Sequence, residues 1–187
     1  MRVYVVRHGE SETNKAHCWT GWLDVPLTEK GVTDAQKAGK ILAGVEFDKA
    51  YSSDLIRARK TLETALPGFE YETSPMLRET DAGDIAGKPI IPFTEEEKRL
   101  MNEKGYAAFG GETNEEFTDR VRGFMKKLEE CDFENVAIFS HAGWLRRFLD
   151  LVIGVSLPRE SVRCKNCTVG VFEYENGIWR LHSWINV

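Results

Sequence analysis

The sequence contains no long apolar run. No segment of its 187 residues approaches the ~18 consecutive apolar residues that a membrane-spanning helix requires. The nearest candidate, FLDLVIGVSL, is interrupted by Asp150. The apolar run at the N-terminus is too short for a signal peptide, and charged residues follow it directly. We therefore expect a cytoplasmic protein that has no membrane partner.

The sequence also lacks a surplus of basic residues. It has 25 lysines and arginines against 30 aspartates and glutamates, which gives a formal net charge of −5. Broad nucleic-acid surfaces need a basic face, so we expect no nucleic-acid partner. This charge balance still leaves room for one small cationic pocket.

Cysteine is scarce as well. Cys164 and Cys167 form one C-x-x-C in the stretch CKNC, and no second pair is present to complete a zinc site. The other two cysteines are Cys18 and Cys131. Reduced thiols with a structural role are expected in a cytoplasmic protein.

Apolar patterning predicts strands that alternate with helices along a single domain of residues 1–187. It predicts strands at 3–8, 49–53 and 135–140, a short strand near 69–73, and a tail hairpin that turns at Asn176-Gly177. Helices are expected at 28–43, 53–66, 113–130 and 142–154, with a short one near 94–104. This alternation indicates an α/β fold around a mostly parallel, mixed sheet. Residues 80–112 are expected to form an irregular, lid-like insertion.

Three of the predicted helices begin with capping residues. Thr28 is expected to cap the helix at 28–43, and Ser53 or Asp54 the helix at 53–66. Thr113 and Glu116 match a capping box at the start of the helix at 113–130.

Cationic side chains follow three of the predicted strands. The first strand ends in Arg7-His8-Gly9, the strand at 135–140 runs into His141-Ala142-Gly143, and the helix after the second strand carries Arg57. In open α/β sheets, ligands bind beyond the carboxyl ends of the strands, where helix N-termini also point. Guanidinium groups match phosphate oxygens in a bidentate way. We therefore predict a phosphate pocket at this edge, with Gly9 and Gly143 leaving space for close approach.

One histidine at this edge is suited to attack phosphorus. A neutral imidazole nitrogen can attack when an acceptor holds the other ring N–H and so fixes the tautomer. His8 directly follows a buried strand and is the better placed nucleophile, while His141 would donate a hydrogen bond to a non-bridging oxygen. Glu79 could supply the proton that the leaving oxygen needs, because a bound phosphate dianion favours its acid form.

Ordered motifs along almost the whole chain resemble a known family. The motifs are RHGESETN, SSDLIRARKT, LRETDAGDIAGK, GGETNEEFTDRV, SHAGWLR and NCTVGVFEYENGIWRL. Together they resemble the histidine phosphatase superfamily, also called the phosphoglycerate mutase-like family. The resemblance implies a three-layer α/β/α sandwich that uses no metal and no organic cofactor.

The resemblance also implies a role for each candidate residue. His8 would become phosphohistidine, and Glu79 would protonate the leaving group and then activate water. The phosphate pocket would be completed by Arg7, Arg57, His141 and Asn14. Further substrate contacts would come from Thr20, Gly21 and Ala142. Asn166 matches a position that precedes the first hairpin strand, so CKNC would belong to that structural context.

The resemblance favours a phosphatase over a mutase. GGETNEEF is similar to a motif of compact members such as α-ribazole phosphatases and broad-specificity phosphatases, and the segment after Glu79 is short, where mutases carry an extra segment. TGWLDVPLTEKG, in contrast, is similar to a stretch in phosphoglycerate mutases. A phospho-ligand sensor without turnover and a metal hydrolase also compete with the phosphatase reading. The missing H-E-x-x-H spacing argues against a metal site built on His8, His17 and His141.

The expected substrate is a small phosphomonoester whose leaving group has some apolar surface. The lid candidates are residues 15–22 and 88–111. They supply Trp19, Trp22, Phe93, Tyr106 and Phe109, although these aromatics could simply pack the lid against the sheet. No second cluster of arginines or lysines is expected to hold a second phosphate. The exposed edge of the C-terminal hairpin could pair in a homodimer.

Overall fold

A mixed sheet forms the centre of the molecule. Over the residues that the computed structural model describes, 1–158 and 160–187, six strands lie in the order β3-β2-β4-β1-β5-β6. Their bounds are β1 (Arg2–Arg7), β2 (Lys49–Ser52), β3 (Glu72–Thr73), β4 (Asn135–Ser140), β5 (Val169–Glu175) and β6 (Ile178–Ile185). The first four strands are parallel, and β5 runs antiparallel to both β1 and β6. The predicted mostly parallel, mixed sheet is confirmed.

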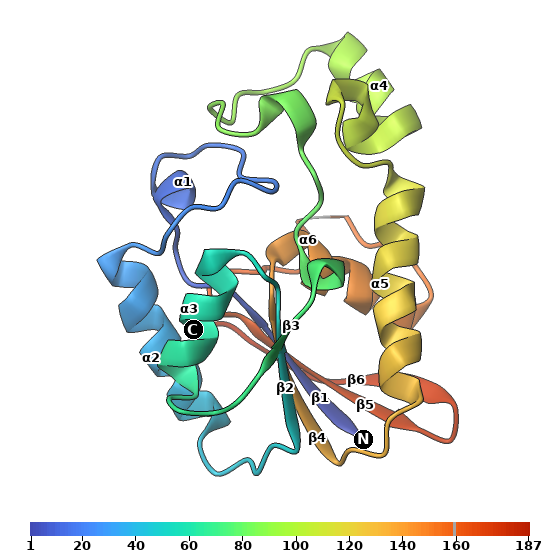
Figure 1. The fold of residues 1–187 in the computed structure, drawn as a ribbon. Coiled ribbons are helices and arrows are strands. Elements are labelled where there is room, and N and C mark those ends of the chain that lie inside the picture. The colour runs from blue at the N-terminus through green and yellow to red at the C-terminus, as the bar shows by residue number, and fades with distance from the viewer. Residues whose placement is uncertain (159) are drawn as a thin grey trace.

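Helices cover both faces of this sheet, which confirms the three-layer sandwich (Figure 1). On one face lie α2 (Glu29–Leu42) and α3 (Ile56–Ala65), and on the other lie α5 (Asn114–Glu129) and α6 (Ala142–Ile153). Alternate residues of β1 pack against the helices on opposite faces of the sheet. Val3 and Val5 pack with α5 and α6, whereas Val6 packs with α2 and α3.

The segment between Glu79 and Thr113 rises beyond the carboxyl ends of β1, β2 and β4 (Figure 1). It contains the 3₁₀ helices η2 (Gly83–Ile85) and η3 (Gly105–Phe109), with α4 (Glu95–Lys104) between them. The short helix α1 (Glu12–Lys15) lies on the same side, in the chain that follows β1. The irregular character predicted for residues 80–112 is therefore accompanied by three short helical elements.

Two of the predicted helix caps are confirmed. Thr28 accepts a hydrogen bond from the backbone N–H of Gly31 at the start of α2, and Thr113 and Glu116 form a reciprocal capping box on α5. The hairpin turn is also as predicted, because Asn176 and Gly177 both have positive φ angles between β5 and β6.

The predicted cap of α3 by Ser53 or Asp54 is wrong. The helix begins at Ile56, and its first N–H donates to Asp24 Oδ1 at 2.6 Å. Asp54 does not serve as a cap because its carboxylate is paired with Arg78. The first N–H group of α3 therefore finds its acceptor in a residue that is distant in sequence. A local sequence pattern does not predict such a cap. The strand expected near 69–73 is also shorter than expected, at two residues.

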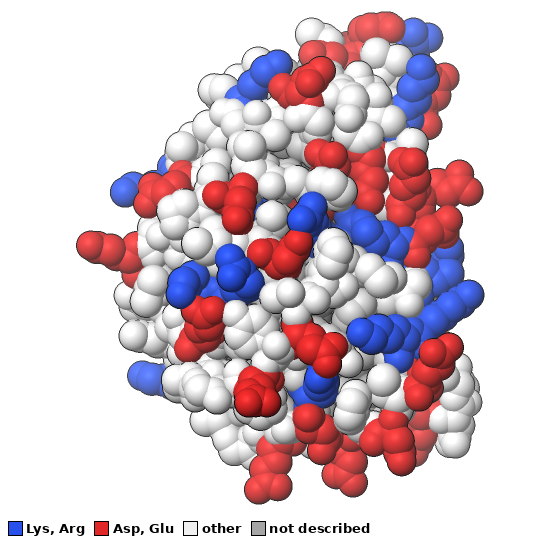
Figure 2. Space-filling view, viewed as in Figure 1, with Lys and Arg blue, Asp and Glu red and all other residues white. Residues whose placement is uncertain are grey.

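The charged surface agrees with the sequence composition. Acidic and basic side chains are mixed across the face shown in Figure 2, and no continuous basic surface covers that face. Among the described residues, no helix combines the length and apolar character needed to cross a membrane.

Candidate active site

The ends of β1 and β4 bring the two predicted histidines together. Arg7 on β1 lies opposite Ser140 on β4, and the His8 backbone N–H donates to the Ser140 carbonyl at 2.9 Å. The rings of His8 and His141 meet edge to face with their centroids 5.1 Å apart. Parallel pairing of two strands therefore places histidines that are far apart in sequence at one point.

His8 has the orientation expected of a nucleophile. Its Nδ1 lies 2.6 Å from the Gly9 carbonyl, a geometry in which Nδ1–H donates and Nε2 keeps its lone pair. The residue is 4% exposed. Burial, followed by the charges of Arg57 and Arg7, lowers the pKa of His8 well below its ordinary value. The imidazole is therefore expected to be neutral at neutral pH.

His141 is as fully buried as Arg57. Within the described residues, neither ring nitrogen of His141 has a hydrogen-bond partner. Burial and the nearby charges, Arg57 foremost, lower the pKa of His141 well below its ordinary value. A buried imidazole without a hydrogen-bond partner is costly in free energy.

The two predicted arginines, Arg7 and Arg57, bring positive charge into the site. Arg7 Nη1 donates to the Cys164 carbonyl at 2.6 Å, and Arg57 donates to the carbonyls of Leu23 and Gly21 at 2.6 and 2.9 Å. Neither guanidinium forms an ion pair within the described part of the chain, and both Nε atoms are buried without a partner. Burial lowers the pKa of Arg57 to about 10, so it stays charged at neutral pH. Two such uncompensated cations define an anion site.

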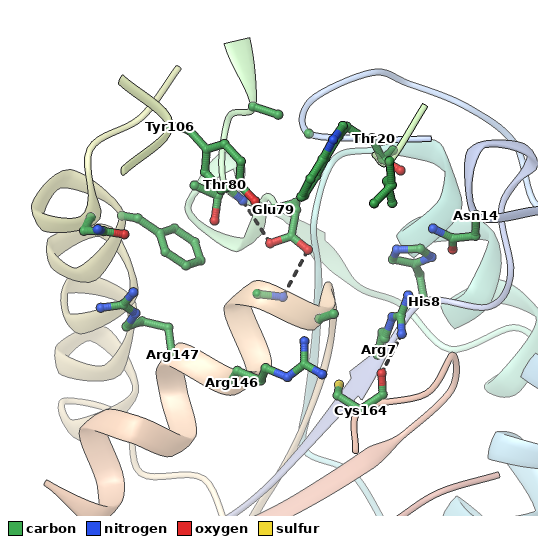
Figure 3. Close-up of a pocket in the computed structure, with 18 of the residues that line it drawn as sticks. Arg7, His8, Asn14, Thr20, Glu79, Thr80, Tyr106, Arg146, Arg147 and Cys164 are labelled. Carbon is green, nitrogen blue, oxygen red and sulfur yellow. Dashed lines mark hydrogen bonds between the residues drawn. The ribbon is translucent and has the colours of Figure 1, made fainter. Parts of the chain in front are cut away.

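Glu79 is the carboxylate that faces these cations. It follows the 3₁₀ helix η1 (Pro75–Leu77), and its two carboxylate oxygens accept hydrogen bonds of 3.0 Å from the N–H groups of Thr80 and Gly143. Its carbonyl accepts from Trp22 Nε1 and Arg120 Nη2. The carboxyl group is therefore fixed against the first turn of α6 (Figure 3).

The two glycines of the site make room for the close approach of protein groups, and Gly143 also lines the cavity. For Gly9 this corrects the expectation that it leaves space for the ligand. A Cβ on Gly9 would lie 2.4 Å from the Gly31 carbonyl oxygen of α2. A Cβ on Gly143 would lie 2.2 Å from Glu79 Oε1. Gly143 therefore permits the approach of the carboxylate to α6.

Most of the predicted substrate contacts line one cavity of about 400 Å³. Its wall includes eight of the nine predicted site residues, namely Arg7, His8, Asn14, Thr20, Gly21, Arg57, Glu79 and Ala142. The ninth, His141, is buried beside His8 and does not line the cavity. The predicted residues at the carboxyl edge of the sheet thus surround a single cavity.

The turn that contains CKNC supports the end of β1. The Cys167 N–H lies within hydrogen-bonding distance of the carbonyls of Arg7 and His8, and Asn166 Nδ2 donates to the His8 carbonyl at 3.1 Å and to Asn14 Oδ1 at 3.0 Å. Both cysteines of the turn are free and buried. Asn166 therefore links the nucleophile's backbone to Asn14, a contact that sequence reasoning did not assign.

Two arginines of the cavity wall were not predicted from the sequence. Arg146 and Arg147 on α6 both line the cavity. The signal was present in SHAGWLRR, because Arg146 lies four residues after Ala142 and so shares its helix face. Cys18, Thr80, Asn114, Asp150 and Cys164 also line the wall and were not predicted.

The lid aromatics divide between packing and the cavity. Trp19 and Tyr106 line the cavity, while Phe93 stacks between Trp19 and Phe109 with centroid separations of 5.6 Å on both sides. Trp22 neither lines the cavity nor joins this aromatic stack. Its indole N–H donates to the Glu79 carbonyl, and its ring lies 4.9 Å from the Arg78 guanidinium. Only part of the predicted aromatic set is thus accessible to a substrate.

The site combines a buried neutral histidine, unpaired arginines and a carboxyl group at the carboxyl edge of an α/β sheet. Residues 3–187 match the family model of the histidine phosphatase superfamily (branch 1), and the chain belongs to that family. Known members of its wider group are phosphatases or mutases, so the family supports an enzyme. Among the described residues, no cluster of three or more His, Cys, Asp or Glu side chains is arranged to hold a metal ion.

The chain is similar both to proteins named phosphoglycerate mutase and to proteins named phosphatase. It is 29% identical to a probable phosphoglycerate mutase, GpmB, of Salmonella paratyphi A over 99% of this chain and 90% of the relative. The α-ribazole phosphatase of Shigella flexneri has a similar structure, with a TM-score of 0.80, 27% identity, and coverage of 97% of this chain and 95% of that one. A phosphoglycerate mutase from Bacillus anthracis gives a TM-score of 0.82 at 25% identity, covering 98% and 92%.

Proposed function

We propose that this protein is a phosphomonoesterase that hydrolyses a small phosphorylated metabolite through a phosphohistidine on His8. The observation that carries the proposal is the neutral His8 imidazole, whose Nδ1 is held by the Gly9 carbonyl beside two unpaired arginines. Such a group has a free Nε2 lone pair directed at an anion site. Residues 1–187 would act as one domain, with residues 80–112 as a lid.

The first step transfers the phosphoryl group to the enzyme. Nε2 of His8 forms a bond to phosphorus while the bond from phosphorus to the leaving oxygen breaks. Glu79 gives its proton to that oxygen, so the alcohol leaves neutral. Positioning and charge neutralisation dominate such reactions, and Arg7, Arg57, His141 and Asn14 would supply them.

The second step returns the enzyme to its starting state. The Glu79 carboxylate accepts a proton from water as the water oxygen bonds to phosphorus and the bond to Nε2 breaks. Inorganic phosphate leaves and His8 is neutral again. The N–H groups at the start of α6, Ala142 included, favour the negative charge on the phosphoryl oxygens.

A mutase is the second candidate, because relatives named phosphoglycerate mutase cover almost the whole chain. A mutase would return the phosphoryl group from His8 to a second hydroxyl of the substrate. The short segment that follows Glu79 favours the phosphatase. Release of inorganic phosphate, as opposed to an isomeric phosphomonoester, distinguishes the two reactions.

Brief mixing with a ³²P-labelled phosphomonoester followed by quenching tests the intermediate. We expect an acid-labile, base-stable label on His8, and we expect His8→Ala to lose both label and turnover. His17→Ala, in an exposed histidine after α1, is the matched control and should keep both. An active enzyme that never carries the label would refute the proposal. Binding of the phosphomonoester without hydrolysis would favour the phospho-ligand sensor. Activity that a strong chelator abolishes would favour the metal hydrolase.

The acid role of Glu79 is tested by leaving-group dependence. We expect Glu79→Gln to slow alkyl phosphates by roughly 10²- to 10⁴-fold and 4-nitrophenyl phosphate much less, because only the alkoxide needs a proton. Glu115→Gln, an exposed carboxylate on α5, is the control. Equal slowing of both substrates would remove Glu79 from this role.

A further inference from the structure

An ion pair next to the Glu79 segment has no part in the proposed phosphoryl transfer. Glu112 lies just before α5 and Arg120 lies within that helix. Arg120 Nε and Nη2 donate to Glu112 Oε1 and Oε2 at 2.8 and 2.7 Å, which is a bidentate arrangement. The two side chains are only 15% and 12% exposed, yet neither residue lines the cavity. The pair is therefore shielded from solvent without being placed to touch a substrate there.

The Arg120 guanidinium also binds the backbone of the segment that carries Glu79. Its Nη1 donates to the carbonyls of Met76 and Arg78 at 3.0 and 2.8 Å, and its Nη2 donates to the Glu79 carbonyl at 3.1 Å. Together with the two bonds to Glu112, these contacts use all five N–H donors of the guanidinium. One side chain therefore fixes three carbonyls within four consecutive residues.

Glu112 holds the other side of Glu79. Its Oε2 accepts from the Asp81 N–H at 3.2 Å, and its own N–H donates to the Asp81 carbonyl at 3.1 Å. The contact is close, since a Cβ on Gly111 would lie 2.2 Å from that carbonyl oxygen. The ion pair thus holds the backbone on both sides of Glu79.

The position of the Glu79 carboxyl group depends on this backbone. The carboxylate oxygens accept only from the N–H groups of Thr80 and Gly143 among the described residues, and Figure 3 shows the side chain reaching toward the first turn of α6. A proton donor must lie within hydrogen-bond reach of the leaving oxygen, and a displacement of about 1 Å can cost on the order of 10²-fold in rate. A shift of the segment would therefore move the acid away from that oxygen.

We propose that Glu112 and Arg120 are positioning residues that hold the Glu79 carboxyl group where it can give its proton to the leaving oxygen. This inference rests on the proposed function, because it concerns the first step of that reaction. The juxtaposition that carries it is one guanidinium whose donors are divided between the Glu112 carboxylate and the backbone around Glu79.

The dependence of kcat/KM on the leaving group tests the positioning role. Arg120→Met removes all five hydrogen bonds, and we expect kcat/KM for butyl phosphate to fall about 10- to 100-fold. The value for 4-nitrophenyl phosphate should stay within about threefold, because kcat/KM covers only formation of the phosphohistidine and nitrophenoxide leaves without a proton. Arg120→Lys keeps the charge but not the five-donor pattern, so it should behave like Arg120→Met. Glu112→Gln keeps one acceptor oxygen and should give a smaller shift in the same direction.

A double substitution shows whether Arg120 acts through Glu79. In the Glu79→Gln background, Arg120→Met should change kcat/KM for butyl phosphate by less than about threefold, because the acid that it positions is already absent. Arg122→Met is the matched control, since Arg122 is exposed on the same helix and pairs with Asp119. It should leave both substrates unchanged. Inhibition by inorganic phosphate should also stay within about threefold in every variant, which verifies the fold and the phosphate pocket.

Three results would overturn the positioning role. They are equal slowing of both substrates in Arg120→Met, a full additional loss in the Glu79→Gln background, and a wild-type substrate ratio in Arg120→Lys. Should Arg120→Met fail to fold, the ratios in Arg120→Lys and Glu112→Gln decide in the same way.

The proposed function fails by a different measurement. A wild-type protein that turns over phosphomonoesters without forming a phosphohistidine would refute the proposed function. A protein that forms the phosphohistidine and keeps its substrate ratio in Arg120→Lys and Glu112→Gln would refute the positioning role alone.

Discussion

Two imidazoles remain neutral beside two guanidinium groups, and this sets the pH range over which His8 can react. Burial and the charges of Arg57 and Arg7 lower the pKa of His8, so its neutral form persists as the pH falls below 6.5. We expect kcat/KM for 4-nitrophenyl phosphate, corrected for the fraction of substrate dianion, to stay level between pH 7.5 and about 5.5. A pH–rate profile measures this. An acid limb centred at or above pH 6.5 would contradict the neutral, buried nucleophile.

Gly143 controls where the carboxyl group of Glu79 can lie. An alanine there would place Cβ 2.2 Å from Glu79 Oε1 and would also disturb the hydrogen bond from the Gly143 N–H. We expect Gly143→Ala to slow alkyl phosphates by at least about tenfold more than 4-nitrophenyl phosphate, although the carboxylate is retained.

Gly123→Ala on α5 is the matched comparison for this substitution. Its Cβ would meet only the flexible end of Met76, so the rates of both substrates should stay within about threefold of the wild type. If Gly143→Ala left the alkyl to nitrophenyl ratio unchanged, the fixed position of Glu79 would not matter for proton transfer.

At the scale of elements, α3 and the loop before it depend on each other. Asp24 caps the first N–H of α3, and Arg57 on that helix donates to the Gly21 and Leu23 carbonyls of the same loop. We expect Asp24→Ala to lower the free energy of unfolding by about 1 kcal/mol, as loss of a helix cap does. It should also weaken binding of inorganic phosphate, because Arg57 loses its fixed position. Urea unfolding and phosphate inhibition constants measure the two effects.

Asp24→Asn is the conservative comparison, because an asparagine oxygen can still accept from Ile56. It should recover most of the lost stability. Unchanged phosphate binding in Asp24→Ala, with stability lost, would show that the cap supports the helix without positioning Arg57.

Elements with strong local signals could be predicted from the sequence, and those defined by distant partners could not. The strand β4 was predicted at residues 135–140 and lies there, because a continuous apolar run needs no partner to be recognised. The cap of α3 comes from Asp24, and β3 has only two residues that pair with β2, so neither has a local signature.

The same distinction applies to the candidate site. Arg7 ends β1 and His8 follows it directly, so their place at the sheet edge could be predicted. Arg146 was missed because its place in the cavity wall depends on which helix face meets the cavity. That relation is visible only when the neighbouring elements are in place.

At the scale of the whole molecule, the buried histidines link stability to pH. Both have a lowered pKa in the folded protein, so the unfolded chain binds more protons below pH 6.5, and stability falls as the pH drops through that value. Between pH 7.5 and 5.5 each histidine is expected to cost up to ~1.4 kcal/mol. Urea unfolding at several pH values measures the slope, which should be smaller in His8→Gln. An identical slope in that variant would contradict the assignment.

The central place of β1 also separates two kinds of motion. Because β1 is hydrogen-bonded to β4 on one side and β5 on the other, we expect its amide hydrogens to exchange with solvent only when the sheet opens. Residues 80–112 are held by a small aromatic cluster that includes Trp19 and by backbone hydrogen bonds to residues 17–19, and we expect them to open locally at lower cost than the sheet. Small molecules would then enter and leave through local opening of this segment, while the imidazole beneath it remains attached to the centre of the sheet.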